Sequence, residues 1–144
     1  MNIREAVITD IAAIAQLSLV LGYSDVSPSI LTTRLAMIID SDTDRIWLFE
    51  AGSEIVGWLH AFVGLRLASA PFIEIAGIAV SAESRKQGVG RSLINEASQW
   101  SAEMGVDLRV RCHSERLEAH LFYRALGFSE LKSQRVFILR AAET

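Results

Sequence analysis

The 144-residue sequence predicts a single domain of the α/β class, with its elements in the order β-α-α-β-β-β-α-β-α-β. Three observations predict this class. Runs with apolar residues at helical spacing alternate with runs rich in Ile, Val, Phe and Trp, short polar links join the central runs, and glycines follow the helical runs. Because 51% of the residues are hydrophobic and the length is that of one ordinary domain, residues 1–144 are expected to bury a core without disulfides or metal.

The N-terminal segment predicts a strand followed by a helix. Residues 2–7 are the strand candidate. Apolar residues recur at helical spacing over residues 11–21, with Thr9 or Asp10 as the candidate N-cap and Gly22 as the stop. Both elements are therefore expected before residue 23.

A second helix and three strands follow. Ser27 and Pro28 suit an N-cap and a first helical turn, so a helix is expected through about Ile39. Three β-branched and aromatic runs then predict strands over residues 45–51, 55–67 and 72–80. The sequence from Ala51 to Glu54 is typical of a hairpin turn, and strands joined by such short links are expected to be antiparallel.

The C-terminal half predicts a helix, a strand, a helix and a strand. From Gly88 the apolar residues change to helical spacing, and that helix is expected to end at Gly105. Charged and apolar residues alternate over residues 107–112, which predicts a strand. A helix over residues 117–126 is closed by Gly127, and residues 134–140 predict a last strand.

Charge and composition exclude several classes of protein. A formal charge of −3 gives no overall positive field for nucleic acid or an anionic membrane, and no apolar run approaches the roughly 18 residues of a spanning helix. The single cysteine, Cys112, and a start without a secretory pattern predict a cytoplasmic protein. No metal site is expected, because the four soft ligands, His60, His113, His120 and Cys112, include no suitably spaced pair.

A glycine-rich basic stretch, RKQGVGRS over residues 85–92, separates an apolar strand from a helix. The first N–H groups of a helix have no intrahelical partner and lie at the positive end of its dipole, so they suit an anion. Gly88 and Gly90 let an anion approach the backbone, and Arg85, Lys86 and Arg91 add positive charge. The stretch is therefore a candidate phosphate or pyrophosphate site.

Other interpretations of this stretch are weaker. A nucleotide P-loop requires a glycine where Arg85 stands and a lysine where Arg91 stands. The dinucleotide fingerprint requires a third glycine at Leu93 and a position in the first βα unit. A plain surface turn with solvated cations stays open if the stretch is judged alone.

Together with a second motif, the stretch resembles the GNAT superfamily of N-acetyltransferases. Arg85-x-x-Gly88-x-Gly90 after IEIAGIAV is similar to the acetyl-CoA motif of that family, Q/R-x-x-G-x-G/A. AHLFYRALGF, from Ala119 to Phe128, looks like its second signature, A-x-x-x-Y-x-x-x-G-F. The opening IREAVITDIAAIAQL and the order of elements are similar too, so the resemblance covers essentially the whole chain.

The resemblance implies a mixed sheet that splays between its fourth and fifth strands, with the pantetheine arm of acetyl-CoA in the gap. The backbone of the fourth strand would bind that arm at Ile78, Ala79 and Val80. The cosubstrate-binding loop would comprise Arg85, Lys86, Gln87, Gly88, Val89, Gly90 and Arg91. Gly77 within the fourth strand is consistent with a bulge or close approach, or with an ordinary weak point.

Acetyl transfer to an amine requires a base, an oxyanion partner and a proton donor for the leaving thiolate. Glu74 is the only ionisable residue between Pro71 and Val80, and it matches a position where one branch of the family carries a catalytic glutamate. Burial beside apolar neighbours would raise its pKa and make it a better base. Binding of the substrate ammonium and a structural ion pair with Arg109 or Arg111 stay open.

Tyr123 matches the general-acid position of the family. Its phenol, with an ordinary pKa of about 10, is protonated at neutral pH and can donate to a thiolate. Packing of the ring in the core is the alternative. The resemblance therefore implies an acetyl-CoA-dependent N-acetyltransferase, acting by direct attack in a ternary complex.

The acceptor and the partners are less sharply predicted. A primary amine is expected, either a cationic small molecule or a protein or peptide amine, with specificity in residues 21–35 and 65–71. A homodimer is left open. A noncatalytic acyl-CoA-binding sensor or an interaction module is the alternative function.

Overall fold

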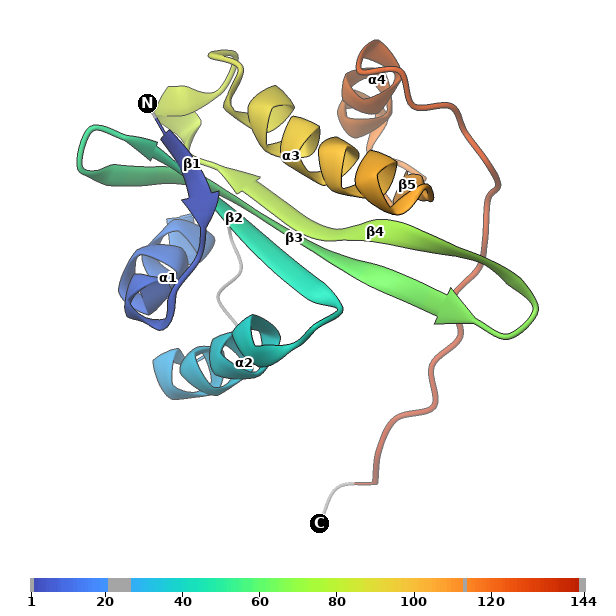
Figure 1. The fold of residues 1–144 in the computed structure, drawn as a ribbon, viewed down its shortest axis with the longest axis horizontal. Helices are drawn as coiled ribbons and strands as arrows, with labels where there is room; N and C mark the ends of the chain where they lie inside the picture. The colour runs from blue at the N-terminus through green and yellow to red at the C-terminus, as the bar shows by residue number, and fades with distance from the viewer. Residues whose placement is uncertain (1, 21–26, 113, 143–144) are drawn as a thin grey trace. The chain divides into compact units, whose positions relative to one another are not determined.

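The computed structural model describes residues 2–20, 27–112 and 114–142 (Figure 1). The chain divides into two units, Met1–Arg111 and Cys112–Thr144. In order, the first unit contains β1 (Asn2–Glu5), the 3₁₀ turn η1 (Ile8–Asp10), α1 (Ile11–Val20), α2 (Pro28–Asp40), β2 (Asp44–Ala51), β3 (Glu54–Arg66), β4 (Ser69–Val80), the 3₁₀ turn η2 (Ala82–Ser84), α3 (Val89–Met104) and β5 (Asp107–Val110). The second unit contains α4 (Leu117–Ala125).

The sheet is mixed and has the order β1-β2-β3-β4-β5, so the predicted class is confirmed. The first four strands are antiparallel neighbours. The link from β2 to β3 is a tight turn because Gly52 adopts a φ of +64°. β5 pairs parallel with β4, and α3 makes the crossover between these two strands.

Helices cover both faces of the sheet (Figure 1). α3 packs against one face, where an added Cβ on Gly57 would lie 2.9 Å from Val89 Cγ1 and 3.1 Å from Leu93 Cδ1. α1 and α2 lie on the opposite face, where Ile14 and Leu35 join Leu48 in a buried cluster. In the described residues, no helix is both long and apolar enough to cross a membrane.

Most predicted helix ends agree with the structure. Ser27 caps α2 by accepting the Ile30 N–H at 3.4 Å, and Gly105 ends α3 with a φ of +69°. The predicted capping of α1 by Thr9 or Asp10 is wrong, because both residues lie inside η1, where the Asp10 carboxylate accepts the Val7 N–H at 2.7 Å. Gly22, the predicted stop of α1, lies outside the described residues.

The predicted last strand, residues 134–140, is also wrong. This segment contains no helix or strand, and Val136, Phe137 and Leu139 are 88%, 89% and 98% exposed. A strand needs a neighbour that satisfies its backbone N–H and C=O groups, and no strand of the described chain pairs with this segment. Strand propensity alone therefore does not make it a strand.

Arg4 joins β1, η1 and β2 through a charged cluster that the sequence did not reveal. Its guanidinium donates to both oxygens of Asp10, at 2.7 and 2.8 Å, and its Nε donates to Glu50 at 2.6 Å. Asp10 is buried. The hydrogen bond from Arg4, opposed by burial and assisted by the Val7 N–H, holds the pKa of Asp10 below its usual value.

Asp10→Asn is expected to lower the free energy of unfolding at pH 7 by about 2 to 3 kcal/mol, because Arg4 loses its charged partner. The pKa of Asp10 is lower in the native protein than in the unfolded chain. The full contribution of its carboxylate to the free energy of unfolding is therefore present above the unfolded pKa of about 3.9. It is lost as the pH falls through the native value. Urea unfolding of the unmodified protein and of Asp10→Asn, at pH 7 and at pH 3, measures the difference in their free energies of unfolding. The same difference at both pH values would contradict the prediction.

Candidate active site

The predicted cosubstrate loop lies between β4 and α3. After η2 the chain turns through two residues with left-handed backbone, Lys86 with a φ of +65° and Gly88 with a φ of +83°. Lysine in this conformation is strained, whereas glycine is not. The two turns bring the chain into α3 at Val89.

The start of α3 exposes backbone N–H groups. Its first backbone hydrogen bond runs from the Ser92 N–H to the Gly88 carbonyl oxygen at 2.9 Å, and no side chain of the described residues caps the helix. The N–H groups of the first turn, residues 89–91, therefore have no helical acceptor. Together with the dipole of a 16-residue helix, they form a terminus that suits an anion.

The side chains of the loop divide into exposed cations and internal supports. Arg85, Lys86 and Arg91 are exposed and make no ion pair within the part of the chain that the structure describes. The Gln87 side-chain amide donates a hydrogen bond to the backbone carbonyl oxygen of Glu83 at 3.0 Å, which stabilises the turn. Val89 is buried against β3, so it offers a ligand only its backbone.

One edge of β4 is open beside this loop. β5 pairs only with residues 72–75 of β4, which leaves residues 76–80 without a ladder partner on that side among the described strands. Ile78, Ala79 and Val80 lie in this open part, and because backbone groups of alternate residues point to opposite edges, some of theirs face the gap.

The register of β4 and β3 changes next to Gly77. His60 pairs with Gly77 and Ala61 with Ile75, which leaves Ala76 as the extra residue of a bulge. The Trp58 ring packs closely against Gly77, since a Cβ atom added to Gly77 would lie 3.1 Å from the ring. Of the interpretations left open for Gly77, a bulge beside it and the close approach of another group are both present.

Glu74 lies buried on the face of the sheet opposite α3, beside Arg109 in the parallel register. The Arg111 Nε lies 3.1 and 3.2 Å from the two oxygens of Glu74. The Arg109 Nε lies 3.8 Å from Oε1. The structural pairing that the sequence left open is therefore present, and it fixes the orientation of the carboxylate.

Two further side chains on this face were missed by the sequence reasoning. His60 Nε2 lies 2.7 Å from Asp44 Oδ2, and Asp44 also accepts hydrogen bonds from Ser41 and Thr43. Burial alone would raise the pKa of Asp44, but the hydrogen bonds from His60, Thr43 and Ser41 together lower it. No local spacing signals this pair, because the register of β2 and β3 creates it.

Tyr123 lies in the second unit, half-buried on α4. Its ring makes edge contacts with Phe122 and Phe128, with centroid distances of 5.3 and 5.5 Å. The Phe128 backbone N–H donates a hydrogen bond to the backbone carbonyl oxygen of Tyr123 at 3.0 Å. This bond joins the two aromatic positions of the predicted second signature. The ring is thereby held at the end of its helix.

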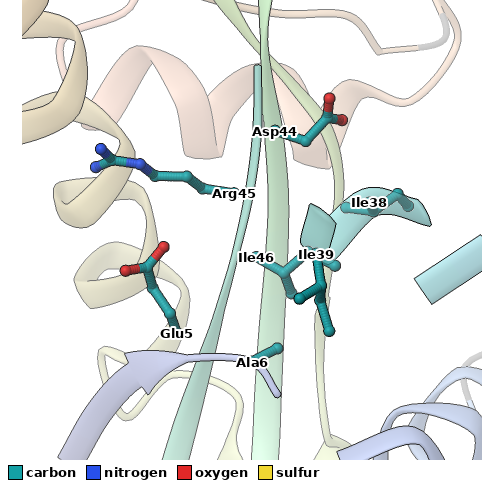
Figure 2. A pocket seen from close by; sticks show the side chains of 7 residues that line it. All are labelled: Glu5, Ala6, Ile38, Ile39, Asp44, Arg45 and Ile46. Carbon is teal, nitrogen blue, oxygen red and sulfur yellow. The ribbon is translucent and has the colours of Figure 1, made fainter. Parts of the chain in front are cut away.

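A small hollow of about 50 Å³ lies between the end of α2 and β2, and Asp44 is the one residue described above in this site that lines it. Figure 2 shows Ile46 beside Ile39 on one side of β2, while Arg45 and Glu5 point to the other side. The described residues contain no cluster of three His, Cys, Asp or Glu side chains placed to hold a metal ion.

The fold is that of acyl-CoA N-acyltransferases, and solved structures share it over nearly the whole chain. Aminoglycoside 6'-N-acetyltransferase AAC(6')-IG from Acinetobacter haemolyticus matches at a TM-score of 0.82 and 18% identity, covering 99% of this chain and 100% of that one. AAC(6')-Iy with a CoA bisubstrate analogue matches at 0.85 and 19%, covering 97% and 98%. A transcriptional regulator from Bacillus halodurans matches at 0.85 and 23%, covering 96% and 99%.

The family profile described as Acetyltransferase (GNAT) family matches residues 12–128. The chain belongs to this family, which confirms the predicted class of enzyme, an N-acetyltransferase with acetyl-CoA as its cosubstrate. No curated protein matches the sequence.

Proposed function

We propose that the protein transfers the acetyl group of acetyl-CoA to a primary amine by direct attack in a ternary complex. One observation carries the proposal. The uncapped N-terminus of α3, reached through Lys86 and Gly88, lies at the end of a strand whose last residues are open on one edge. Such a terminus suits a diphosphate, and an open strand edge suits an amide-containing arm.

The residues fit acetyl-CoA by their chemistry. The N–H groups of residues 88–91 would bind the pyrophosphate, assisted by Arg85, Lys86 and Arg91. Backbone groups of Ile78, Ala79 and Val80 would bind the pantetheine amides. Val89 and Gln87 shape the loop through their contacts with β3 and Glu83.

The chemical step assigns one role to each catalytic candidate. The amine lone pair attacks the thioester carbonyl carbon, the carbon–sulfur bond breaks, and the thiolate takes a proton from the Tyr123 hydroxyl. The acylated nitrogen then loses its remaining excess proton, which returns through water to the Tyr123 phenolate and restores the phenol. Glu74 takes the proton that the ammonium must lose, directly or through water. Arg111 occupies about two of the roughly four acceptor positions of a carboxylate, so Glu74 keeps capacity to accept that proton.

A small-molecule amine is the proposed acceptor. The structural neighbours named above as aminoglycoside acetyltransferases support a small acceptor, and a protein or peptide amine is the alternative. We also propose that residues 1–144 work as one acetyltransferase domain, since the matched residues 12–128 span both units.

Acetyl-CoA at a hundredfold excess over its Kd is expected to raise the melting temperature by roughly 5 to 10 °C, because it binds only the folded protein. Thiol release with a panel of amines then identifies the acceptor. Absence of any thermal shift with acetyl-CoA or CoA contradicts the proposed site, whereas binding without thiol release favours the noncatalytic sensor.

Gly88→Val is expected to weaken acetyl-CoA binding about tenfold or more, because a β-branched residue resists the positive φ that starts α3. Gly105→Val is the matched control. It places the same residue at a φ of +69° at the other end of α3, and both glycines have open space at the Cβ position. Calorimetric titration should show reduced affinity only for Gly88→Val, and equal losses in both variants would assign the effect to stability.

A further inference from the structure

The sheet face that carries Glu74 also holds a guanidinium with unused donors. Arg109 pairs with Glu74 in the β4–β5 register, so both side chains lie on the face opposite α3. The Arg109 Cζ lies 4.2 Å from the centroid of the Phe72 ring. This cation–π contact with a buried ring restricts where the guanidinium can lie.

Arg109 makes no hydrogen bond with any residue that the structure describes. Among the described residues it forms an ion pair with Glu74, and the 3.8 Å separation between Arg109 Nε and Glu74 Oε1 is too long for a hydrogen bond. Only 22% of the Arg109 side chain is exposed. A largely buried guanidinium whose five N–H groups have no hydrogen-bond acceptor among the described residues, and whose ion pair with Glu74 is long, suits an anion.

The charges around Glu74 favour an anion over a further cation. One carboxylate faces two guanidiniums, those of Arg111 and Arg109. A third guanidinium, that of Arg66, lies 5.4 Å from the same Phe72 ring. Asp107 precedes Arg109 on this face but forms no ion pair with it.

We propose that Arg109 binds a carboxylate of the acceptor, so that the substrate is an amine that also carries a carboxylate, as in an amino acid. A planar guanidinium matches a carboxylate with two parallel hydrogen bonds. Such an acceptor places its carboxylate on Arg109 and its ammonium near Glu74. A polycation, in contrast, meets a cluster with excess positive charge.

That the carboxylate-bearing amine is the acetyl acceptor rests on the proposed function. Its binding to Arg109, however, can be measured without turnover. Calorimetric titration of the CoA-loaded protein with L-amino acids, their carboxamides and 1,4-diaminobutane tests the inference. At least one amino acid is expected to bind about tenfold or more tightly than its own carboxamide. If every carboxamide or the diamine binds as tightly as the amino acids, or if none of the probes binds, the inference is wrong.

Arg109→Met is expected to abolish the preference for the carboxylate, since methionine keeps the packing over Phe72 but has no donor. Arg45→Met is the matched control, because Arg45 stacks on Trp100 at 4.6 Å on the α3 side of the sheet. The Arg45→Met protein should prefer the amino acid over its carboxamide as strongly as the unmodified protein does. A preference retained in Arg109→Met overturns the assignment. Failure of the acetyltransferase function alone would abolish thiol release and leave the binding preference intact.

Discussion

Replacing Tyr123 with phenylalanine is expected to lower kcat by about a hundredfold or more without changing the affinity for acetyl-CoA. The substitution removes only the hydroxyl that we propose as the proton donor to the thiolate. The edge contacts of the ring with Phe122 and Phe128 persist, so the signature at the end of α4 should keep its structure. Steady-state thiol release gives kcat, and calorimetry gives the Kd for acetyl-CoA.

A matched control separates the hydroxyl from the packing around it. Phe122→Leu removes a neighbouring ring that contacts Tyr123 but removes no proton donor. This variant should keep a kcat close to that of the unmodified protein. An unchanged kcat in Tyr123→Phe would remove the hydroxyl from the mechanism, and a loss in Phe122→Leu as large as in Tyr123→Phe would assign the effect to the helix end.

Local elements were predictable because each depends on its own residues. α3 is an example, since Leu93, Ile94 and Ala97 recur at helical spacing and are all buried in the structure. Its N-terminal turn was also foreseeable, because Gly88 adopts the positive φ that glycine permits at low cost. The exposed N–H groups that make this terminus suitable for an anion could therefore be inferred from the sequence.

Contacts between distant residues could not be predicted in the same way. Arg4 lies 46 positions from Glu50, and His60 lies 16 positions from Asp44, so only the strand register joins them. The pairing of Glu74 with an arginine was foreseen as one of several roles because charged and apolar residues alternate around Arg109. That Arg111 bonds both carboxylate oxygens depends on where β5 ends.

The last strand failed for a different reason. Residues 134–140 have the composition of a strand, but a strand is defined by its neighbour as well as by its own residues. The sequence predicts propensity and says nothing of whether a free edge is available. The same limit applies to the open edge of β4, which was expected from the family resemblance and not from residues 76–80 themselves.

Glu74→Gln is expected to lower both kcat and stability, and a double variant separates the two effects. Glutamine leaves Arg111 and Arg109 facing an uncharged group, which should cost about 1 to 2 kcal/mol because the Arg111 side chain is 54% exposed. Loss of the proposed base should lower kcat about a hundredfold. Urea unfolding and steady-state kinetics measure the two quantities on the same preparation.

Adding Arg111→Gln to Glu74→Gln removes one of the two facing charges, so we expect stability to recover while kcat stays low. Recovery of both would show that Glu74 serves only as the partner of Arg111 and that another group is the base. Glu50→Gln is the matched control on the same sheet, because it breaks an ion pair with Arg4 at 2.6 Å away from the proposed chemistry. It should lose stability and keep its kcat, since its carboxylate has no part in proton transfer.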